Sequence, residues 1–177
     1  MDAIELLIED HRTVKDLFGR FDRSVRSQTL RRLADQIVRE LSVHAAIEEA
    51  KLYPIVRKEL DGGEFLYTKS REEHQQMDVI LADLDEGLEE AHTPAFAAHI
   101  ASLRREVERH VEEEERRIFP LLRRAISETR LDRLGMELKR AKAVAPTRPR
   151  RHQSEVRMVT EKRSSEADKG RDLVKGD

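Results

Sequence analysis

The sequence predicts an all-α protein: an up-down-up-down four-helix bundle, followed by a short fifth helix and a flexible basic C-terminal tail. Charged side chains make up 40% of the 177 residues and aromatic side chains only 4%, whereas a typical soluble domain is about 25% charged. With 7 glycines and 5 prolines, the chain has too few turn residues for a protein rich in sheets. Apolar residues recur every three or four positions, which is the period of one helix face.

The first two predicted helices form a hairpin. The first covers residues 2–25, and its apolar stripe is interrupted at one position by His11. The second covers residues 28–60 and ends at two consecutive glycines. Its stripe is interrupted by His44 and Glu48, so polar groups occupy positions that should face the core.

The third and fourth helices follow the same plan. The third covers residues 65–91 and carries His74 in its apolar stripe. The fourth begins at a Thr-Pro pair, residues 93–94, which is typical of an N-cap followed by the first helical residue. His110 and Glu114 interrupt its stripe. Four long helices with short connections predict an antiparallel bundle.

We expect three segments in the chain. Residues 1–127 form the bundle, residues 128–145 form a short accessory helix, and residues 146–177 form a basic tail. The tail has few apolar residues, so it is predicted to be disordered and solubilising. Its charge could attract nucleic acid, an acidic membrane or an acidic partner, but it lacks the interleaved aromatics that stack on bases. Nucleic acid is therefore not an expected partner.

The two hairpins are internal repeats of one another. Glu9-Asp10-His11 aligns with Glu72-Glu73-His74, and the segment 44–57 aligns with the segment 110–123. Each half therefore carries a lone histidine on its first helix and a His-x-x-x-Glu motif on its second. Two such hairpins predict a pseudo-symmetric bundle.

The six polar stripe residues predict a metal centre. Residues four apart on a helix point toward the same spot, so each His-x-x-x-Glu motif presents two donors together. Burying two carboxylates without partners costs several kcal/mol, and cations would remove that cost. Two metal ions, each held by two histidines and bridged by Glu48 and Glu114, would satisfy every group. Imidazole with carboxylate suits iron, zinc or manganese, and the absence of cysteine excludes thiolate sites.

This order of residues resembles the hemerythrin-like, or HHE cation-binding, domain over residues 4–125. The resemblance implies a four-helix bundle around a non-haem di-iron centre, in which an oxo or hydroxo group bridges two iron ions. His11 and His44 would hold one iron, and His74 and His110 the other. Glu48 would bridge the two irons together with Glu114.

The sequence departs from the oxygen-carrying hemerythrins at two positions. They have a second histidine four residues after the third-helix histidine, where this chain has Asp78. They also place an aspartate five residues after the fourth-helix histidine, where this chain has Glu115, so that Glu114 is the natural ligand of the repeat. One nitrogen ligand is therefore missing, and an open position favours turnover of a bound oxidant over oxygen carriage.

Tyr53 is the candidate for the missing ligand. It follows Glu48 by five residues, and ideal helix geometry would turn it about 140° away from that carboxylate. Pro54 cannot donate a backbone hydrogen bond and can supply the local distortion that a Tyr53 ligand needs. Alternatively, Tyr53 packs in the core like its counterpart Phe119. The sequence leaves both interpretations open.

Two classes of function follow. In the first, the di-iron centre is enzymatic and reduces or dismutates hydrogen peroxide or nitric oxide, as a peroxidase or catalase would. In the second, it binds oxygen reversibly, stores iron, or senses iron or oxygen. The missing histidine favours the first class. A redox-silent zinc site is a third, less favoured hypothesis.

Other classes are disfavoured. The longest apolar run, residues 79–82, is far shorter than the roughly 20 residues of a membrane span, and the N-terminus lacks the basic region of a signal peptide. The absence of cysteine fits a cytoplasmic location. No Gly-rich phosphate loop or ferritin-type Glu-x-x-His pair is present. The expected partners are therefore small oxidants (O2, H2O2 or NO), and the expected state is a monomer or weak dimer.

Overall fold

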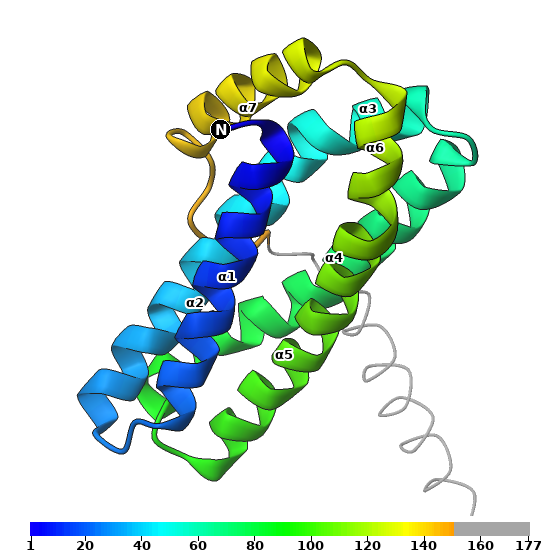
Figure 1. The fold of residues 1–177 in the computed structure, drawn as a ribbon. Helices are drawn as coiled ribbons and strands as arrows, with labels where there is room; N and C mark the ends of the chain where they lie inside the picture. The colour runs from blue at the N-terminus through cyan, green and yellow to red at the C-terminus, as the bar shows by residue number, and fades with distance from the viewer. Residues whose placement is uncertain (151–177) are drawn as a thin grey trace, which may run out of the picture.

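The computed structural model describes residues 1–150 and contains only helices and connecting segments in that range. Four long helices form the predicted antiparallel bundle (Figure 1): α1 (Ala3–Asp22), α2 (Ser27–Ile47), α4 (Gly63–Glu86) and α5 (Pro94–Glu113). The remaining elements are η1 (Glu48–Leu52), α3 (Tyr53–Glu59), η2 (Leu88–Glu90), η3 (Glu114–Ile118), α6 (Phe119–Ala125) and α7 (Glu128–Lys142). The all-α class is thereby confirmed, and none of the helices within residues 1–150 is long and apolar enough to cross a bilayer.

Local hydrogen bonds explain where the helices begin and end. At the start of α1, Asp2 Oδ1 accepts from the Glu5 N–H at 2.9 Å while Glu5 Oε2 accepts from the Asp2 N–H at 2.9 Å, which is a capping box. The predicted end of this helix near residue 25 is wrong. The Ser24 N–H bonds to the Phe21 carbonyl in a tighter turn, at 3.1 Å, and Val25 is 90% exposed.

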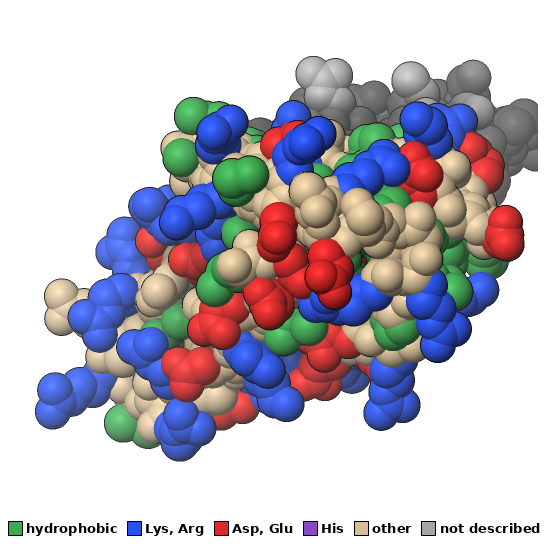
Figure 2. All heavy atoms as spheres, turned by 45° about the horizontal axis from the view of Figure 1, so that its top comes forward, with side chains coloured by type: hydrophobic (Ala, Val, Ile, Leu, Met, Phe, Trp, Pro, Cys, Tyr) green, Lys and Arg blue, Asp and Glu red, His purple; other side chains and the backbone are tan. Residues whose placement is uncertain are grey.

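The apolar stripes form two core clusters on either side of a polar layer. One cluster joins the N-terminal half of α1 to α3, α6 and α7, and it includes Leu7, Leu52, Val56, Leu122 and Leu134. The other joins the remaining half of α1 to α2, α4 and α5, and it includes Leu17, Ile37, Leu81, Ile100 and Leu103. Charged side chains of both signs are interspersed over the face shown in Figure 2. Most of the 40% charge is thus solvated helix surface, as expected.

Helix α7 lies across one end of the bundle, beside the N-terminus of α1 (Figure 1). Its buried side chains are Leu131, Leu134 and Leu138, which belong to the first core cluster. Close approach to α1 is possible because α7 has a glycine, Gly135, at the crossing. A Cβ atom at Gly135 would lie 2.9 Å from the Met1 carbonyl oxygen and 3.0 Å from the Ala3 nitrogen.

The first five residues of the predicted tail, residues 146–150, contact the bundle through two arginine side chains. Arg148 lies 2.8 Å from carboxylate oxygens of both Asp35 and Asp85, and Arg150 lies 2.9 Å from Glu49. Basic side chains here meet acidic side chains of α2, η1 and α4, and these ion pairs seat the segment on the bundle. The rest of the predicted tail, residues 151–177, lies outside the described residues.

We predict that Gly135→Ala destabilises the protein by about 1–3 kcal/mol, the usual cost of forcing an extra carbon into a packed contact. The obstructing atoms are backbone, so α7 would have to move away from α1. The matched control is Gly19→Ala on α1, where the new Cβ meets only the flexible Arg23 side chain at 3.2 Å. Thermal unfolding of both variants provides the measurement. Equal melting temperatures would contradict the close crossing.

Candidate metal centre

The polar layer between the two core clusters contains all seven residues singled out from the sequence. Each is at most 7% exposed, and together they come from α1, α2, η1, α3, α4, α5 and η3: His11, His44, Glu48, Tyr53, His74, His110 and Glu114. All four long helices of the bundle thus contribute side chains to one buried site. Polar groups of this kind remain inside a protein only when they have partners.

Two π-helical turns shape this layer. In η1 the Tyr53 N–H bonds to the Glu48 carbonyl five residues back, and in η3 the Phe119 N–H bonds to the Glu114 carbonyl in the same way. Pro54 follows Tyr53 and Pro120 follows Phe119, and each proline lacks a backbone N–H donor. The wider turn brings Tyr53 round toward Glu48, which an ideal α-helix would not do. The distortion that a Tyr53 ligand needs is therefore present.

The first metal group contains His11, His44, Glu48 and Glu114. One donor atom from each lies within 4.8 Å of the others. His44 Nε2 lies 3.2 Å from Glu48 Oε1, and His11 Nε2 lies 3.3 Å from Glu114 Oε2. None of these four buried atoms has a hydrogen-bond partner. Two imidazole nitrogens and two carboxylate oxygens that face one another without partners fit a divalent or trivalent cation.

The second metal group contains Glu48, His74 and His110, whose donor atoms also lie within 4.8 Å of one another. The Tyr53 hydroxyl lies 3.0 Å from His74 Nε2 and 3.2 Å from His110 Nε2. It also lies 3.1 Å from Glu114 Oε1. The phenol is therefore in the middle of this group, while its counterpart Phe119 stacks on His11 at 5.9 Å in the first group.

Glu48 and Glu114 each direct one carboxylate oxygen toward the first metal group and the other toward the second. Glu48 Oε1 faces His44, and its Oε2 lies 3.5 Å from His74 Nε2. Glu114 Oε2 faces His11, and its Oε1 lies 3.6 Å from His110 Nε2. This arrangement suits two carboxylates that bridge a pair of metal ions.

Three further carboxylates form hydrogen bonds with the outer nitrogens of the imidazoles, and a fourth, Asp10, faces His44 at ion-pair distance. Glu115 Oε1 lies 2.8 Å from His11 Nδ1, and Glu49 Oε1 lies 3.3 Å from His74 Nδ1. Such a contact holds a ligating imidazole in one tautomer and one orientation. Glu49 and Glu115 thus lie where they can orient His74 and His11. Glu113 pairs instead with Lys69 and Arg117.

Two carboxylates that face outer imidazole nitrogens were not singled out from the sequence. Glu73 Oε2 lies 2.8 Å from His110 Nδ1, and Asp10 Oδ2 lies 3.7 Å from His44 Nδ1. Both stand directly before the lone histidine of their repeat. That shared position in the aligned triplets was the signal that could have identified them.

The charges in this layer strongly affect its protonation. Burial opposes a charged His44, but the neighbouring carboxylates, Glu48 first among them, outweigh burial and raise the pKa of His44 to about 10. The pKa of His110 is raised in the same way, mainly by Glu114. Burial together with these two carboxylates raises the pKa of Tyr53 well above its usual value. Metal binding at this layer therefore displaces protons from its ligands.

A small apolar cavity adjoins the site. Its wall consists of ligand histidines together with Val14, Leu41, Met77, Asp78, Leu81 and Val107. The cavity volume is about 20 Å³, on a scale where one water molecule needs roughly 10–15 Å³. The cavity thus has room for a molecule of a few atoms beside the metal groups.

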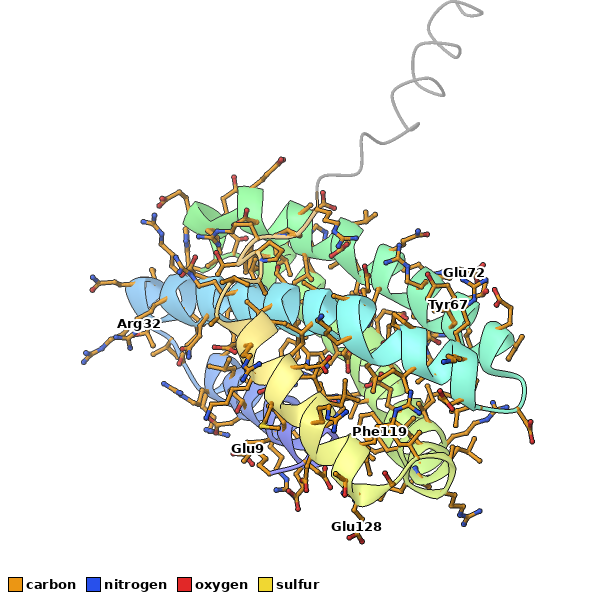
Figure 3. The ribbon with its side chains drawn as sticks, turned by 90° about the horizontal axis from the view of Figure 1, so that it is seen from above. Glu9, Arg32, Tyr67, Glu72, Phe119 and Glu128 are labelled. Carbon is orange, nitrogen blue, oxygen red and sulfur yellow. The ribbon has the colours of Figure 1, made fainter. Side chains whose placement is uncertain are left out.

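Two histidines, His92 and His99, lie outside the apolar stripes. Both are exposed, and neither belongs to a metal group. Figure 3 shows the contrast between inside and outside: Phe119 lies within the bundle, whereas Glu9 and Glu72 lie on its outer surface. The remaining histidine, His152, lies outside the described residues.

The fold and the site define a helical-bundle protein with a buried metal-binding site built from histidine and glutamate. The chain belongs to the family of the hemerythrin HHE cation binding domain, whose sequence pattern matches residues 2–144. The matched residues include α7. The family match confirms the resemblance seen in the six-residue motif.

Known relatives agree with this assignment. The chain is similar to a hemerythrin HHE cation binding domain-containing protein of known structure from Mycobacterium kansasii, with a TM-score of 0.68 and 25% identity over 81% of this chain and 89% of that chain. It is also 26% identical over 144 residues to an uncharacterized hemerythrin-like protein of Schizosaccharomyces pombe, covering 81% of this chain and 70% of that protein. A DNA nickase of Nostoc is 28% identical over 145 residues. The match covers 81% of this chain but only 40% of the nickase.

Proposed function

We propose that this protein is a non-haem di-iron protein that binds and turns over a small oxidant, hydrogen peroxide or nitric oxide. The observation that supports the proposal is a phenol among the imidazoles of the second metal group, in a chain that lacks one of the histidines of the oxygen carriers. Asp78 stands where oxygen carriers have a histidine, and the Tyr53 hydroxyl lies within 3.0–3.2 Å of His74 Nε2 and His110 Nε2. A centre with this donor set is suited to cycling between oxidation states rather than to holding oxygen unchanged.

The side chains of the chain have separate tasks in this proposal. His11, His44, Glu48 and Glu114 would hold one iron, and His74, His110 and Tyr53 would complete the other with the same two carboxylates. When bound, two irons would pass electrons from one peroxide, oxidised to O2, to a second, reduced to water, or would carry electrons from an external donor to peroxide or nitric oxide. The apolar wall of the adjoining cavity excludes bulk water and admits only a small molecule. Glu115 and Glu49 keep His11 and His74 oriented while the oxidant is bound.

The second candidate is reversible oxygen binding, or storage or sensing of iron or oxygen, without turnover. The apolar wall of the cavity favours it, because exclusion of water also protects a bound molecule from further reaction. The two candidates differ in whether oxidant disappears over many cycles.

We predict that iron-loaded protein consumes peroxide by dismutation, or peroxide or nitric oxide when an electron donor such as ascorbate is added. Consumption should continue over repeated cycles at about 1 s⁻¹ or faster, the lower end of ordinary enzyme rates. His44→Ala should reduce consumption to background, because it removes a ligand of the first group. His99→Ala, at an exposed histidine, is the matched control and should consume oxidant like the wild type. Stopped-flow absorbance with each oxidant gives the rates. A stable, reversible oxygen adduct with no consumption of either oxidant would favour the second candidate instead.

A further inference from the structure

The chain after α7 returns along the bundle (Figure 1). Arg148 joins two helices there, since its guanidinium nitrogens lie 2.8 Å from Asp35 Oδ1 of α2 and 2.8 Å from Asp85 Oδ1 of α4. Residues 146–150 thus cross the surface beside α2 and α4. We call residues 142–150, from the end of α7 to Arg150, the C-terminal segment.

Lys142 connects the C-terminal segment to the first metal group. Its Nζ lies 2.5 Å from Asp10 Oδ1. The other oxygen, Asp10 Oδ2, lies 3.7 Å from His44 Nδ1. The Asp10 side chain is only 12% exposed, so the lysine is the cation that neutralises it on the side away from the imidazole. Holding one oxygen of the carboxylate leaves the other facing His44.

Arg150 makes the corresponding connection to the second metal group. Its Nη1 lies 2.9 Å from Glu49 Oε2, and Arg71 of α4 contacts the same oxygen. The second oxygen, Glu49 Oε1, lies 3.3 Å from His74 Nδ1. With its side chain 9% exposed, Glu49 is held between two guanidinium groups on one side and an imidazole on the other.

These contacts break the symmetry of the internal repeat. The repeat equivalent of Asp10 is Glu73, whose cation is Lys69 of the same helix, at 3.9 Å. The repeat equivalent of Glu49 is Glu115, which is 38% exposed and forms no ion pair with Lys or Arg among residues 1–150. Asp10 and Glu49 therefore each receive a cation from outside the four repeated helices, and their repeat equivalents do not.

We propose that the C-terminal segment is a clamp on the metal centre, in which Lys142 and Arg150 are positioning residues. They act through Asp10 and Glu49 on one imidazole in each metal group. A carboxylate that accepts from the outer nitrogen of a ligating histidine fixes the orientation of the ring. A cation on the far oxygen limits the rotation of that carboxylate, so its other oxygen stays directed at the imidazole. The inference rests on the metal centre of the proposed function but not on any oxidant.

The test uses the full chain loaded with Zn²⁺, which carries no redox chemistry and accepts histidine and carboxylate ligands. We expect Lys142→Gln and Arg150→Gln each to release Zn²⁺ to a chelator about tenfold faster than wild type, the lower end of the effect of removing a partner of a ligating imidazole. Lys139→Gln and Arg140→Gln are matched controls, because both residues are exposed on α7 and form no ion pair within the described part of the chain. They should release Zn²⁺ at the wild-type rate.

Two further readouts separate positioning from general stability. Lys142→Arg and Arg150→Lys keep the charge and should restore slow release. The visible spectrum of the Co²⁺-loaded protein should shift in the glutamine variants, because it reports the geometry of the ligands, and should be unchanged in the controls. Release at the control rate in both glutamine variants, or an unshifted Co²⁺ spectrum, would overturn the clamp. Wild-type protein that retains Zn²⁺ but consumes no oxidant would contradict only the proposed turnover.

Discussion

Glu114→Ala should leave the protein without firmly bound iron, because one carboxylate serves both metal groups. Glu114 Oε2 lies 3.3 Å from His11 Nε2, and its Oε1 lies 3.6 Å from His110 Nε2. Its loss removes a ligand from each ion at once. Removing a partner of a ligand already costs 10- to 100-fold in affinity, so loss of a shared ligand should cost more than about 100-fold. Wild-type protein should hold about two iron ions per chain.

Metal analysis of the purified variant, with circular dichroism as a check on folding, measures this effect. The neighbouring variant Glu113→Ala is the matched control, because Glu113 pairs with Lys69 and Arg117 and contacts no imidazole. It should keep its iron. Full retention of iron by a folded Glu114→Ala protein would show that the metal groups are assigned wrongly.

Tyr53→Phe should abolish the visible charge-transfer band that a phenolate gives when it binds ferric iron. The pKa of the Tyr53 hydroxyl is raised well above its usual value by burial and by Glu114 and Glu48. The phenol therefore stays protonated unless a metal ion displaces its proton. The band should vanish completely while most of the iron remains, since His74, His110 and the two carboxylates still hold the second ion. Stability should change by only about 1 kcal/mol, the usual net value of a hydrogen bond.

Absorption spectra of the iron-loaded variants decide this prediction. Tyr67→Phe is the matched control, because Tyr67 is the other tyrosine of the chain and stacks against Arg57 away from the metal groups. Its spectrum should equal that of wild type. If Tyr53→Phe also keeps an unchanged spectrum, Tyr53 is a core aromatic like Phe119, and the second iron has no phenolate ligand.

The fold and the membership of the site followed from local patterns. His44 and Glu48 share a helix face because they are four residues apart, and the repeat in the second half carries the same pair. Those short-range regularities predicted both the bundle and a polar layer of four histidines and two glutamates. Local patterns failed at Val25, where a tight turn ends α1 early.

The sequence by itself thus determined the helices, their pairing as two repeats and the donors of the polar layer, because each depends on spacing within one helix. Only the tertiary structure decided how the halves connect. Glu49 of one half reaches His74 of the other, and Glu115 reaches His11 in return. The contacts of the Tyr53 hydroxyl with His74 and His110 and the return of Lys142 to Asp10 are also tertiary. The spacing of residues along a helix determines which side chains share one face of that helix. Contacts between helices depend also on packing angles and connecting turns, which the pattern within one helix does not contain.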